Sequence, residues 1–438
     1  MSDGEFFKFI FNHWQQYLIV MMPIIALCYL TVRKHAINIF DPIHFYFTFT
    51  FGTSYAVVAI MCIHGLIPIH LSYMVLVNWL ALAIGLSAAR MTKSNISFNF
   101  VSRGFHLLDT NYKAVVFILF FVWLSLTFIY VTSVSFDAFV ASRFEANKGL
   151  GGIVRLLDFI RITLVCSLVI CSIKSSGLTR VSLIMLAAIV VVVSSFVTGA
   201  KFALLESALT ILVAVYIFSG WKPVFTLKTI LVILLLSVIM IAFVLFLLTF
   251  ASESLGYTKS NYMNAPVVVE LFFMRIFANG DMYYFSLPNS VIDGLSVESP
   301  IYQLFGYIIG NGGMNKIFDY DYSGNDIGRM IWKYWYPDDT ISRGPTNHFD
   351  LAGYSYFGLL GGVAMTVIIG FTIGKACKIK NSMAINLVMT SSVIAAVYSR
   401  ALVLLLSPSV GIAYLFDSFV ILSSIILLTW FLARSSRK

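Results

Sequence analysis

The sequence predicts an all-α fold, a polytopic bundle of transmembrane helices, and composition is the first reason. Of its 438 residues, 59% are hydrophobic and only 11% are charged, against roughly 25% charged residues in an ordinary soluble domain. The mean hydropathy is +0.90. A soluble fold of this length cannot bury so much apolar surface, so the bilayer is expected to be the main solvent. The same composition excludes a disordered chain, a coiled coil and a disulfide-rich secreted scaffold.

The second reason is a series of long apolar runs. A spanning helix needs about 20 largely apolar residues, and such runs must be helical because backbone polar groups in lipid have to be bonded internally. About 11–12 spans are predicted, and the distinct candidates are residues 15–32, 43–63, 66–89, 114–134, 153–173, 179–198, 202–219, 225–250, 351–374, 383–404 and 410–432. A glycine-containing hairpin, Thr198–Lys201, is expected between the sixth and the seventh.

The chain is predicted to divide into three segments. About eight spans lie within residues 1–250, a large loop occupies 251–350, and about three spans lie within 351–438. Lysine and arginine concentrate in alternate connections and in the C-terminal tail, which is the distribution expected of cytoplasmic loops. The large loop and the N-terminus are therefore expected on the outer face. The N-terminal sequence lacks a basic n-region, so no cleaved signal peptide is expected.

Three other classes of site are disfavoured. The net charge of +9 is spread over many short connections, so it does not indicate nucleic-acid binding. The five cysteines lie in or beside apolar runs and form no CxxC, so neither a disulfide framework nor a zinc site is expected. Asp319 and Asp321 match the DxD of metal-dependent glycosyltransferases, but their surroundings are typical of a turn. No metal and no cofactor are expected.

The loop 251–350 is acidic and rich in aromatic residues. It holds eleven Asp and Glu but only six Lys and Arg, so it lacks the surplus of positive charge that marks a cytoplasmic loop. A connection of this length is usually functional, and its segment 266–278 is expected to form an amphipathic helix at the membrane interface. Tyr334, Trp335 and Tyr336 are candidates for stacking on a sugar. The alternative for these aromatic residues is an ordinary interfacial belt.

Charged residues within spans are expensive, so they are functional candidates. Arg155, Asp158 and Arg161 are spaced three apart and share one helical face. The alternative is a snorkelling Arg155 beside a structural Asp158–Arg161 pair. Asp417 is a predicted partner of Arg400, and Glu206 lies one turn into the seventh span. Basic residues held in helices near the outer face suit a negatively charged lipid headgroup, because the arginine fork binds two phosphate oxygens.

Two motifs resemble the Wzy-type polymerases of O-antigen and capsule polysaccharides. Residues 344–362, GPTNHFDLAGYSYFGLLGG, are similar to the loop end and Phe-Gly-x-x-Gly helix start of that family. The related O-antigen ligases carry a His-Asn pair at this place, whereas here the order is Asn347-His348. Residues 197–205, VTGAKFALL, resemble the Thr-Gly-Ser-Arg hairpin of the polymerases. Lys201 replaces the arginine, which keeps the charge but loses the bidentate fork.

The resemblance implies a fold related to the GT-C glycosyltransferases and a bacterial inner-membrane enzyme with its active site on the periplasmic face. It implies that the donor and the acceptor are oligosaccharides linked to undecaprenyl diphosphate. An acceptor hydroxyl would attack the anomeric carbon of the donor with inversion, and undecaprenyl diphosphate would leave. Membrane lipids and a chain-length-regulating membrane protein are the other expected partners.

The resemblance also assigns roles to residues. Cations that stabilise the leaving diphosphate are expected at Arg155, Arg161, Lys201, Arg275, Arg343 and Arg400. His348 is the candidate general base because its intrinsic pKa is near neutral, with Asp281 and Asp350 in reserve. If His348 is the base, its replacement by alanine would lower turnover by ~10² or more. Asn347 is expected to contact the sugar. The alternative for His348 is a structural bond to the loop backbone.

Two other functions remain open. An O-antigen ligase would transfer finished glycan onto the lipid A core, and the incomplete His-Asn pattern disfavours it. A lipid-linked oligosaccharide flippase or another transporter would show internal repeats, broken helices and charges near the midplane. The charges of this sequence are expected toward one face, beside the large loop, which favours an enzyme working on that side.

Overall fold

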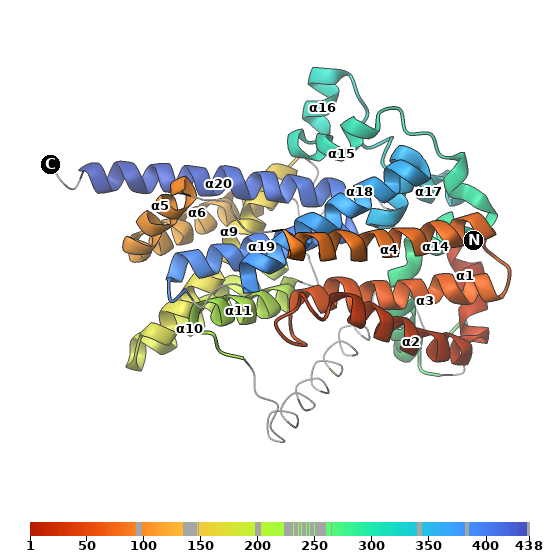
Figure 1. The fold of residues 1–438 in the computed structure, drawn as a ribbon, viewed down its shortest axis with the longest axis horizontal. Coiled ribbons are helices and arrows are strands. Elements are labelled where there is room, and N and C mark those ends of the chain that lie inside the picture. Colours follow the sequence, from red (N-terminus) through yellow and green to blue (C-terminus); the bar gives the residue numbers. More distant parts are fainter. Residues whose placement is uncertain are drawn as a thin grey trace. The chain divides into compact units, whose positions relative to one another are not determined.

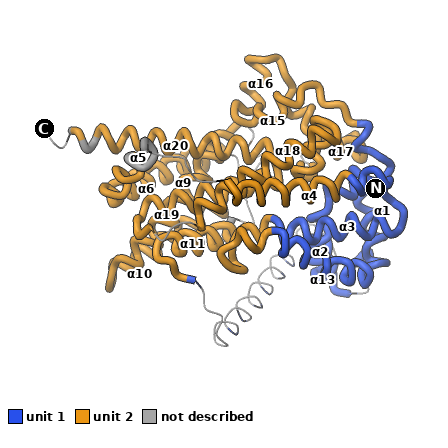
Figure 2. The backbone as a smooth tube through the Cα atoms, in the orientation of Figure 1, with its two compact units in different colours: residues 1–31, 47–73, 222–294 blue, residues 32–46, 74–221, 295–438 orange. Residues whose placement is uncertain are grey.

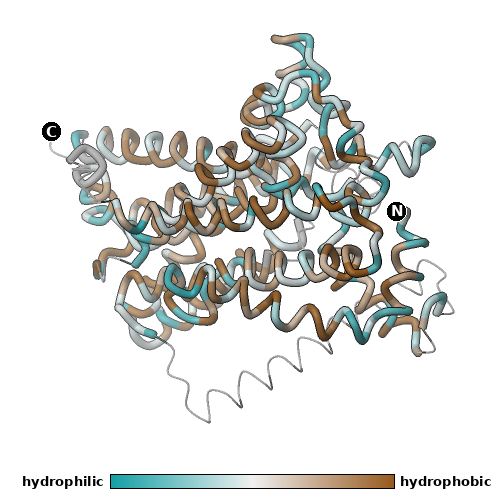
Figure 3. The backbone as a smooth tube through the Cα atoms, turned by 45° about the vertical axis from the view of Figure 1, so that its right-hand side comes forward, coloured by the Kyte–Doolittle hydropathy of each residue, from teal (hydrophilic) through white to brown (hydrophobic). Residues whose placement is uncertain are grey.

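The computed structural model describes residues 1–92, 99–134, 147, 149–197, 203–222, 260–263, 265–339, 344–381 and 385–435, together with six isolated positions between 231 and 249. In these residues, all regular secondary structure is helical (Figure 1). Hydrophobic residues predominate along the long helices, and hydrophilic residues gather in the connections (Figure 3). The predicted all-helical class is therefore confirmed.

Nine helices of the described part of the chain are long and apolar enough to cross a membrane, so this is a multi-pass membrane protein. They match the predicted first to sixth and ninth to eleventh spans. The nine are α2 (Trp14–Val32), η1 with α3 (His44–Phe49 and Thr50–Ile63), α4 (Ile69–Met91), α6 (Tyr112–Ser133), α9 (Gly151–Lys174), α10 (Gly177–Val197), α18 (Phe349–Asn381), α19 (Val388–Leu406) and α20 (Pro408–Ser435).

Two predicted spans differ from this set. The seventh corresponds to α11 (Ala203–Ser219), which at 17 residues is apolar but shorter than the length a span usually needs. The eighth, residues 225–250, falls largely outside the described residues. The extra N-terminal helix α1 (Asp3–Asn12) has ten residues, about 15 Å, and is too short to cross a bilayer.

The helices form two compact units, each assembled from separate stretches of the chain (Figure 2). Unit 1 comprises residues 1–31, 47–73 and 222–294. Unit 2 comprises residues 32–46, 74–221 and 295–438. The predicted segment boundaries near residues 250 and 350 follow span and loop, so they describe the membrane topology and stay a prediction.

In unit 1, short helices from residues 267–286 pack against α3. In α13 (Val267–Phe277), Glu270 is buried and its carboxylate accepts three backbone N–H groups from residues 261–263 at 2.8–3.0 Å. After it, Gly280 lies so close to Val57 that a Cβ would come within 2.9 Å of that side chain. The helix expected over 266–278 is confirmed, and its carboxylate fixes the preceding turn.

Unit 2 is centred on α9 and α19, whose side chains are largely buried. These two helices pack against each other and against α20, while α6, α10 and α11 pack against α9. The start of α19 is capped by a side chain from α5 (Asn99–Thr110): the Asp109 carboxylate accepts the N–H groups of Met389 and Thr390 at 2.7 and 3.2 Å. This carboxylate satisfies two of the N–H groups that a helix start leaves without intrahelical partners.

Small residues bring α4 and α18 into close contact. A Cβ at Gly370 would lie 2.6 Å from the Leu82 carbonyl oxygen and 3.2 Å from the Cα of Gly85. One turn later, Gly374 packs in the same way against Ala89. This is the small-xxx-small packing that lets membrane helices approach and gain van der Waals contact.

We expect Gly370→Ala to destabilise this interface by about 1–3 kcal/mol, because the added methyl group must push α4 away from α18. The measurement is the thermal unfolding midpoint in detergent. Gly312→Ala is the matched control, since a Cβ at Gly312 in α16 (Asn311–Phe318) meets nothing within 4 Å. Equal midpoints for the two variants would contradict the close-packing account.

Helix α18 is broken within the Phe-Gly-x-x-Gly motif. Gly358 has φ 66° and ψ −172°, a conformation open to glycine and costly for other residues. The chain before the break packs back on the chain after it, because a Cβ at Gly353 would lie 3.0 Å from the Cα of Gly362. Residues 349–357 therefore form a short helix that ends the outer loop, and 359–381 remain long enough to span the membrane.

Candidate functional site

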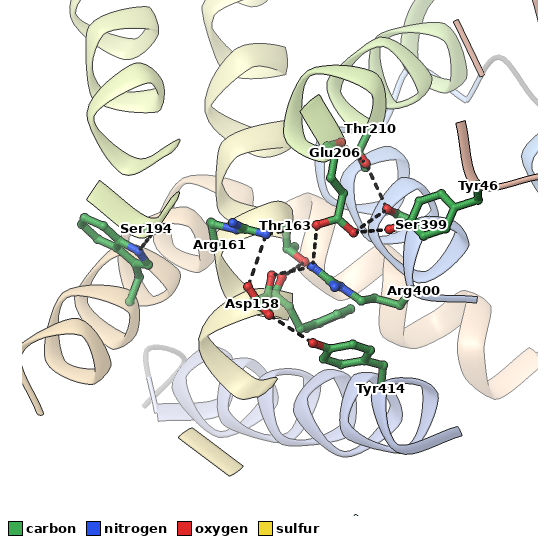
Figure 4. A network of polar contacts seen from close by, with 12 residues as sticks. Tyr46, Asp158, Arg161, Thr163, Ser194, Glu206, Thr210, Ser399, Arg400 and Tyr414 are labelled. Atoms are coloured by element: carbon green, nitrogen blue, oxygen red, sulfur yellow. Dashed lines mark hydrogen bonds and ion pairs between the residues drawn. The ribbon is translucent and has the colours of Figure 1, made fainter. Parts of the chain in front are cut away.

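Three of the predicted arginines and three carboxylates are buried inside unit 2. Arg161 and Arg400 contact Asp158 and Glu206 (Figure 4). Arg155 pairs with Asp417. These six residues come from four helices that are distant in sequence. Helix α9 supplies Arg155, Asp158 and Arg161, α11 supplies Glu206, α19 supplies Arg400, and α20 supplies Asp417. All six side chains are buried. We call this set the arginine–carboxylate network.

Glu206 is the centre of the network. Its Oε2 accepts from Arg161 Nη2 at 3.2 Å and from Arg400 Nη2 at 3.3 Å. Its Oε1 accepts from the hydroxyls of Tyr46 at 2.8 Å and Ser399 at 3.4 Å. One oxygen of this carboxylate thus binds both guanidinium groups, and two hydroxyl groups fix the orientation of the carboxylate through its other oxygen.

Asp158 contacts the same nitrogen of each arginine, Nη2, that Glu206 contacts. Its Oδ1 lies 3.3 Å from Arg161 Nη2, and its backbone carbonyl accepts from Arg400 Nη2 at 3.4 Å. The Tyr414 hydroxyl donates to Asp158 Oδ2 at 3.1 Å, and its ring stacks under the Arg400 guanidinium at 4.6 Å (Figure 4). The predicted Asp158–Arg161 pair is therefore confirmed, as part of a larger network.

Asp417 bonds a different arginine from the predicted one. Its Oδ2 lies 2.7 Å from Arg155 Nε, so the predicted Asp417–Arg400 pair is wrong. Arg155 also donates to the carbonyls of Tyr307 and Ile308 and lies over the Tyr307 ring at 5.1 Å. These carbonyls end α15 (Pro300–Ile309), so the buried Arg155 ties α15 to α9 and does not snorkel.

The network is balanced in charge but not in hydrogen bonds. Three arginines face three carboxylates, so the six side chains have no net charge when all are ionised. Within the described part of the chain, Arg161 Nε and Nη1 and Arg400 Nε are buried and have no hydrogen-bond partner. Buried donors without protein partners are rare and costly. These N–H groups are suited to an anion with several oxygens.

The other predicted cations are not part of this description. Lys201, with the Thr198–Lys201 hairpin, and Arg343 lie outside the described residues. Arg275 is exposed in the last turn of α13 and belongs to unit 1. Its predicted role at the diphosphate stays a prediction.

Asn347, His348 and Asp350 are buried at the start of α18. Burial lowers the pKa of His348 to about 3. The imidazole is thus neutral at physiological pH. A base with so low a pKa accepts a proton weakly at that pH, so it is poorly suited to general-base catalysis. Asp350 Oδ1 accepts its neighbour's N–H, that of Leu351, at 2.9 Å. Burial and the lowered pKa of His348 therefore disfavour the general-base role predicted for it.

The aromatic candidates lie on α17 (Ile327–Trp335) and directly after it. Tyr334 is 57% exposed, and its ring meets that of Trp335 nearly edge-on at 5.1 Å. Tyr336 stacks obliquely on Trp332, whose indole N–H donates to Asp339 at 2.9 Å. An exposed tyrosine beside ordered rings fits a sugar and an interfacial belt equally well, so this role stays a prediction.

Asp281, the third candidate base, belongs to unit 1. Burial raises the pKa of its carboxyl group to about 7, and the nearby carboxylate of Asp3 adds to the rise, while a hydrogen bond from the Met282 N–H opposes it. The fold therefore favours the protonated form of Asp281.

The two DxD residues lie in a turn. Asp319 follows the end of α16 with a positive φ, and Asp321 Oδ1 accepts the Gly324 N–H at 2.9 Å.

We expect Asp281→Asn to stabilise the protein at pH 8 and to change little at pH 4. In the unfolded chain this carboxyl ionises near pH 4, so the wild-type protein loses stability as the pH rises from there through about 7. Asparagine cannot ionise and avoids this loss. Unfolding midpoints at the two pH values, with exposed Asp338→Asn as control, measure the effect. A pH-independent difference would contradict it.

Several contributors to the network gave no signal in the sequence. Tyr46 is 160 residues from Glu206, its hydrogen-bond partner, and Tyr414 is one of many tyrosines. Asp326 was not singled out either, although it accepts a hydrogen bond from Asn347. Only the charged members of the network stand out, because charge within an apolar run is unusual.

The charged members therefore carry most of what can be inferred about this chain. Comparisons with family models, with curated proteins and with solved structures find no match for it. Its function has to be argued from its own residues and their geometry.

Proposed function

We propose that this protein is a glycosyltransferase of the bacterial inner membrane that polymerises oligosaccharide repeat units. It joins repeat units carried on undecaprenyl diphosphate into O-antigen or a similar surface polysaccharide at the periplasmic face. The transfer inverts the anomeric centre, and undecaprenyl diphosphate is the leaving group. The GT-C-like fold, the membrane and the sidedness belong to the proposal.

One observation carries the proposal. Arg161 and Arg400 are held side by side by Glu206, with three buried N–H groups that lack partners among the described residues. A leaving diphosphate gains negative charge in the transition state, so fixed donors at its oxygens lower the barrier. The guanidinium groups are already oriented, so little reorganisation is needed when the diphosphate binds.

The remaining residues of the network have supporting roles in this proposal. The carboxylates of Glu206 and Asp158 offset the repulsion between the two positively charged guanidinium groups. Their hydrogen bonds and ion pairs fix the orientation of both groups. Arg155 holds the end of α15 to α9, which brings the outer loop to the network. The acceptor sugar would approach from the loop, where Asn347 and the aromatic residues of α17 lie in the sequence.

A flippase or transporter is the second candidate, and the depth of the charges favours it. Arg161 is the eleventh residue of α9, which places it about 15 Å from the start of that helix. The network is neutral, and α18 is broken at Gly358, as helices of transporters often are. The charges thus lie deeper than the sequence alone suggested, which weakens the argument from sidedness.

Removing the gene from its host separates these functions by what accumulates. Loss of a polymerase leaves surface glycan of a single repeat unit, because transfer to the surface continues without chain growth. Loss of a ligase leaves long glycan on undecaprenyl diphosphate. Loss of a flippase leaves lipid-linked repeat units inside and no surface glycan. The proposal expects the first pattern, restored to a ladder by a plasmid copy, and either of the others would overturn it.

A further inference from the structure

We propose that Asp326 is the general base that takes the proton from the acceptor hydroxyl, and that Asn347 is its positioning residue. This inference rests on the proposed polymerase function. It replaces His348, Asp350 and Asp281 in that role. It is carried by the place of Asp326 in unit 2, at the junction between the outer loop and the start of α18.

Both oxygens of Asp326 are fixed. Oδ1 accepts the Arg329 N–H at 3.0 Å, which makes Asp326 the N-cap of α17. Oδ2 accepts from the Asn347 side-chain amide at 2.8 Å. An ionised carboxylate offers about four acceptor sites. The Arg329, Gly328 and Asn347 donors use three of them, which leaves one for a substrate hydroxyl. The Asp326 residue as a whole is partly exposed.

Two glycines hold the junction together. A Cβ at Gly328 would lie 2.1 Å from the Pro345 carbonyl oxygen and 2.7 Å from Asn347 Oδ1. A Cβ at Gly344 would lie 2.6 Å from the Gly328 carbonyl carbon. The first turn of α17 is therefore in direct backbone contact with the chain that leads into α18. That contact fixes Asp326 and Asn347 relative to each other.

The chemistry of Asp326 suits a base better than that of the other candidates. Burial raises the pKa of its carboxyl group above the usual range, and the Arg329 N–H, Asn347 and the Arg329 charge limit the rise. Tyr322 and Tyr356 are the other titratable groups that interact with it. A carboxylate of raised pKa is a stronger base, whereas the pKa of His348 is lowered to about 3.

Tyrosines connect this carboxylate to the arginines. Burial and the charge of Asp326 both raise the pKa of Tyr322. The ring of Tyr322 lies 6.3 Å from that of Tyr307, which stacks on the Arg155 guanidinium. Asp326 and Arg155 are thus at the two ends of a short row of aromatic residues. The row therefore links the proposed base to α9, the helix that carries Arg161.

The step balances as a simple displacement. The acceptor hydroxyl oxygen forms a bond to the donor's anomeric carbon while its proton passes to Asp326. The bond from that carbon to the diphosphate oxygen breaks, and its electron pair leaves with undecaprenyl diphosphate. Asp326 then returns the proton to water. No redox partner or further reactant is required.

Asp326→Asn tests this role, because asparagine caps a helix as well as aspartate does. Asn347 can turn its amide to keep the contact, so the fold is preserved while the base is lost. We expect purified enzyme to lose ~10²–10⁴ in the rate of glycan extension. We also expect the rise of that rate with pH to disappear and the Michaelis constant for the acceptor to stay unchanged. Asp321→Asn, the same change at a turn carboxylate of this loop, should stay within twofold.

The outcomes separate this inference from the proposed function. An active wild-type enzyme with an Asp326→Asn variant of normal rate and pH profile overturns the role of Asp326 and leaves the polymerase intact. A wild-type protein that extends no glycan overturns both. If the asparagine variant fails to fold, Asp326→Ser carries the same test, since serine also caps a helix and is no base.

Discussion

Replacing Arg161 or Arg400 by alanine is expected to abolish glycan chain growth while the protein still inserts in the membrane. Each change removes donors that would meet the leaving diphosphate, and loss of one such donor costs about 10²–10³ in rate. Because these guanidinium groups are buried and paired with Glu206, alanine also leaves that carboxylate less compensated. The measurement is the length distribution of glycan formed by purified variants of equal folded amount.

Arg161→Lys separates the two effects. Lysine keeps a positive charge for Glu206 but removes the Nε and Nη1 donors that have no partner among the described residues. We expect its chain growth to fall with little change in stability. Arg434→Ala is the matched control, because this arginine is exposed and stacks on Trp430 in the last turns of α20. Near-normal polymer from both alanine variants would rule out the diphosphate role.

Replacing Lys380 by methionine is expected to destabilise the protein by about 3–5 kcal/mol, the usual cost of breaking a buried ion pair. Lys380 is fully buried, 0% exposed, and bonds the equally buried Asp41. Asp41 also accepts from Tyr398 and from the N–H groups of Ile37 and Ile43. Methionine fills the space but leaves the Asp41 charge without its cation.

The control for this change lies in the same helix. Lys375 is partly exposed beside the Phe371 ring, so Lys375→Met should stay within ~0.5 kcal/mol of the wild-type protein. Unfolding midpoints in detergent compare the two. Glycan extension per folded Lys380→Met molecule should stay near normal, since Lys380 is outside the arginine–carboxylate network. Equal stability of the two variants would contradict a structural ion pair at Lys380.

Much of the fold could be predicted because an apolar run of about 20 residues has to form a helix in lipid. In the described residues, nine of the predicted spans correspond to helices long enough to cross a membrane, the seventh corresponds to the shorter α11, and the helix over 266–278 corresponds to α13. The break at Gly358 could not be predicted, because the sequence around it stays apolar and glycine is common in membrane helices. The burial of Lys380 could not be predicted either, since it depends on Asp41, 339 residues away.

The site was predictable only where charge interrupts an apolar run. Arg155, Arg161 and Arg400 stand out for that reason. The structure brings Arg161 and Arg400 together on Glu206 and pairs Arg155 with Asp417. Their partners could not be assigned, because pairing depends on how the helices pack. Asp417 lies 262 residues from Arg155, and no spacing rule links two such positions. The hydroxyls around Glu206 were missed since tyrosine and serine are ordinary in membrane helices.

The most direct test of polymerisation uses purified protein in lipid with undecaprenyl-diphosphate repeat units of the host polysaccharide. The account predicts a ladder of glycans on a gel, with one undecaprenyl diphosphate released for each repeat unit added. Transfer only when lipid A core is supplied would show a ligase instead. With verified substrate and folded protein, the absence of both the ladder and the released lipid would contradict the proposed enzyme and favour transport.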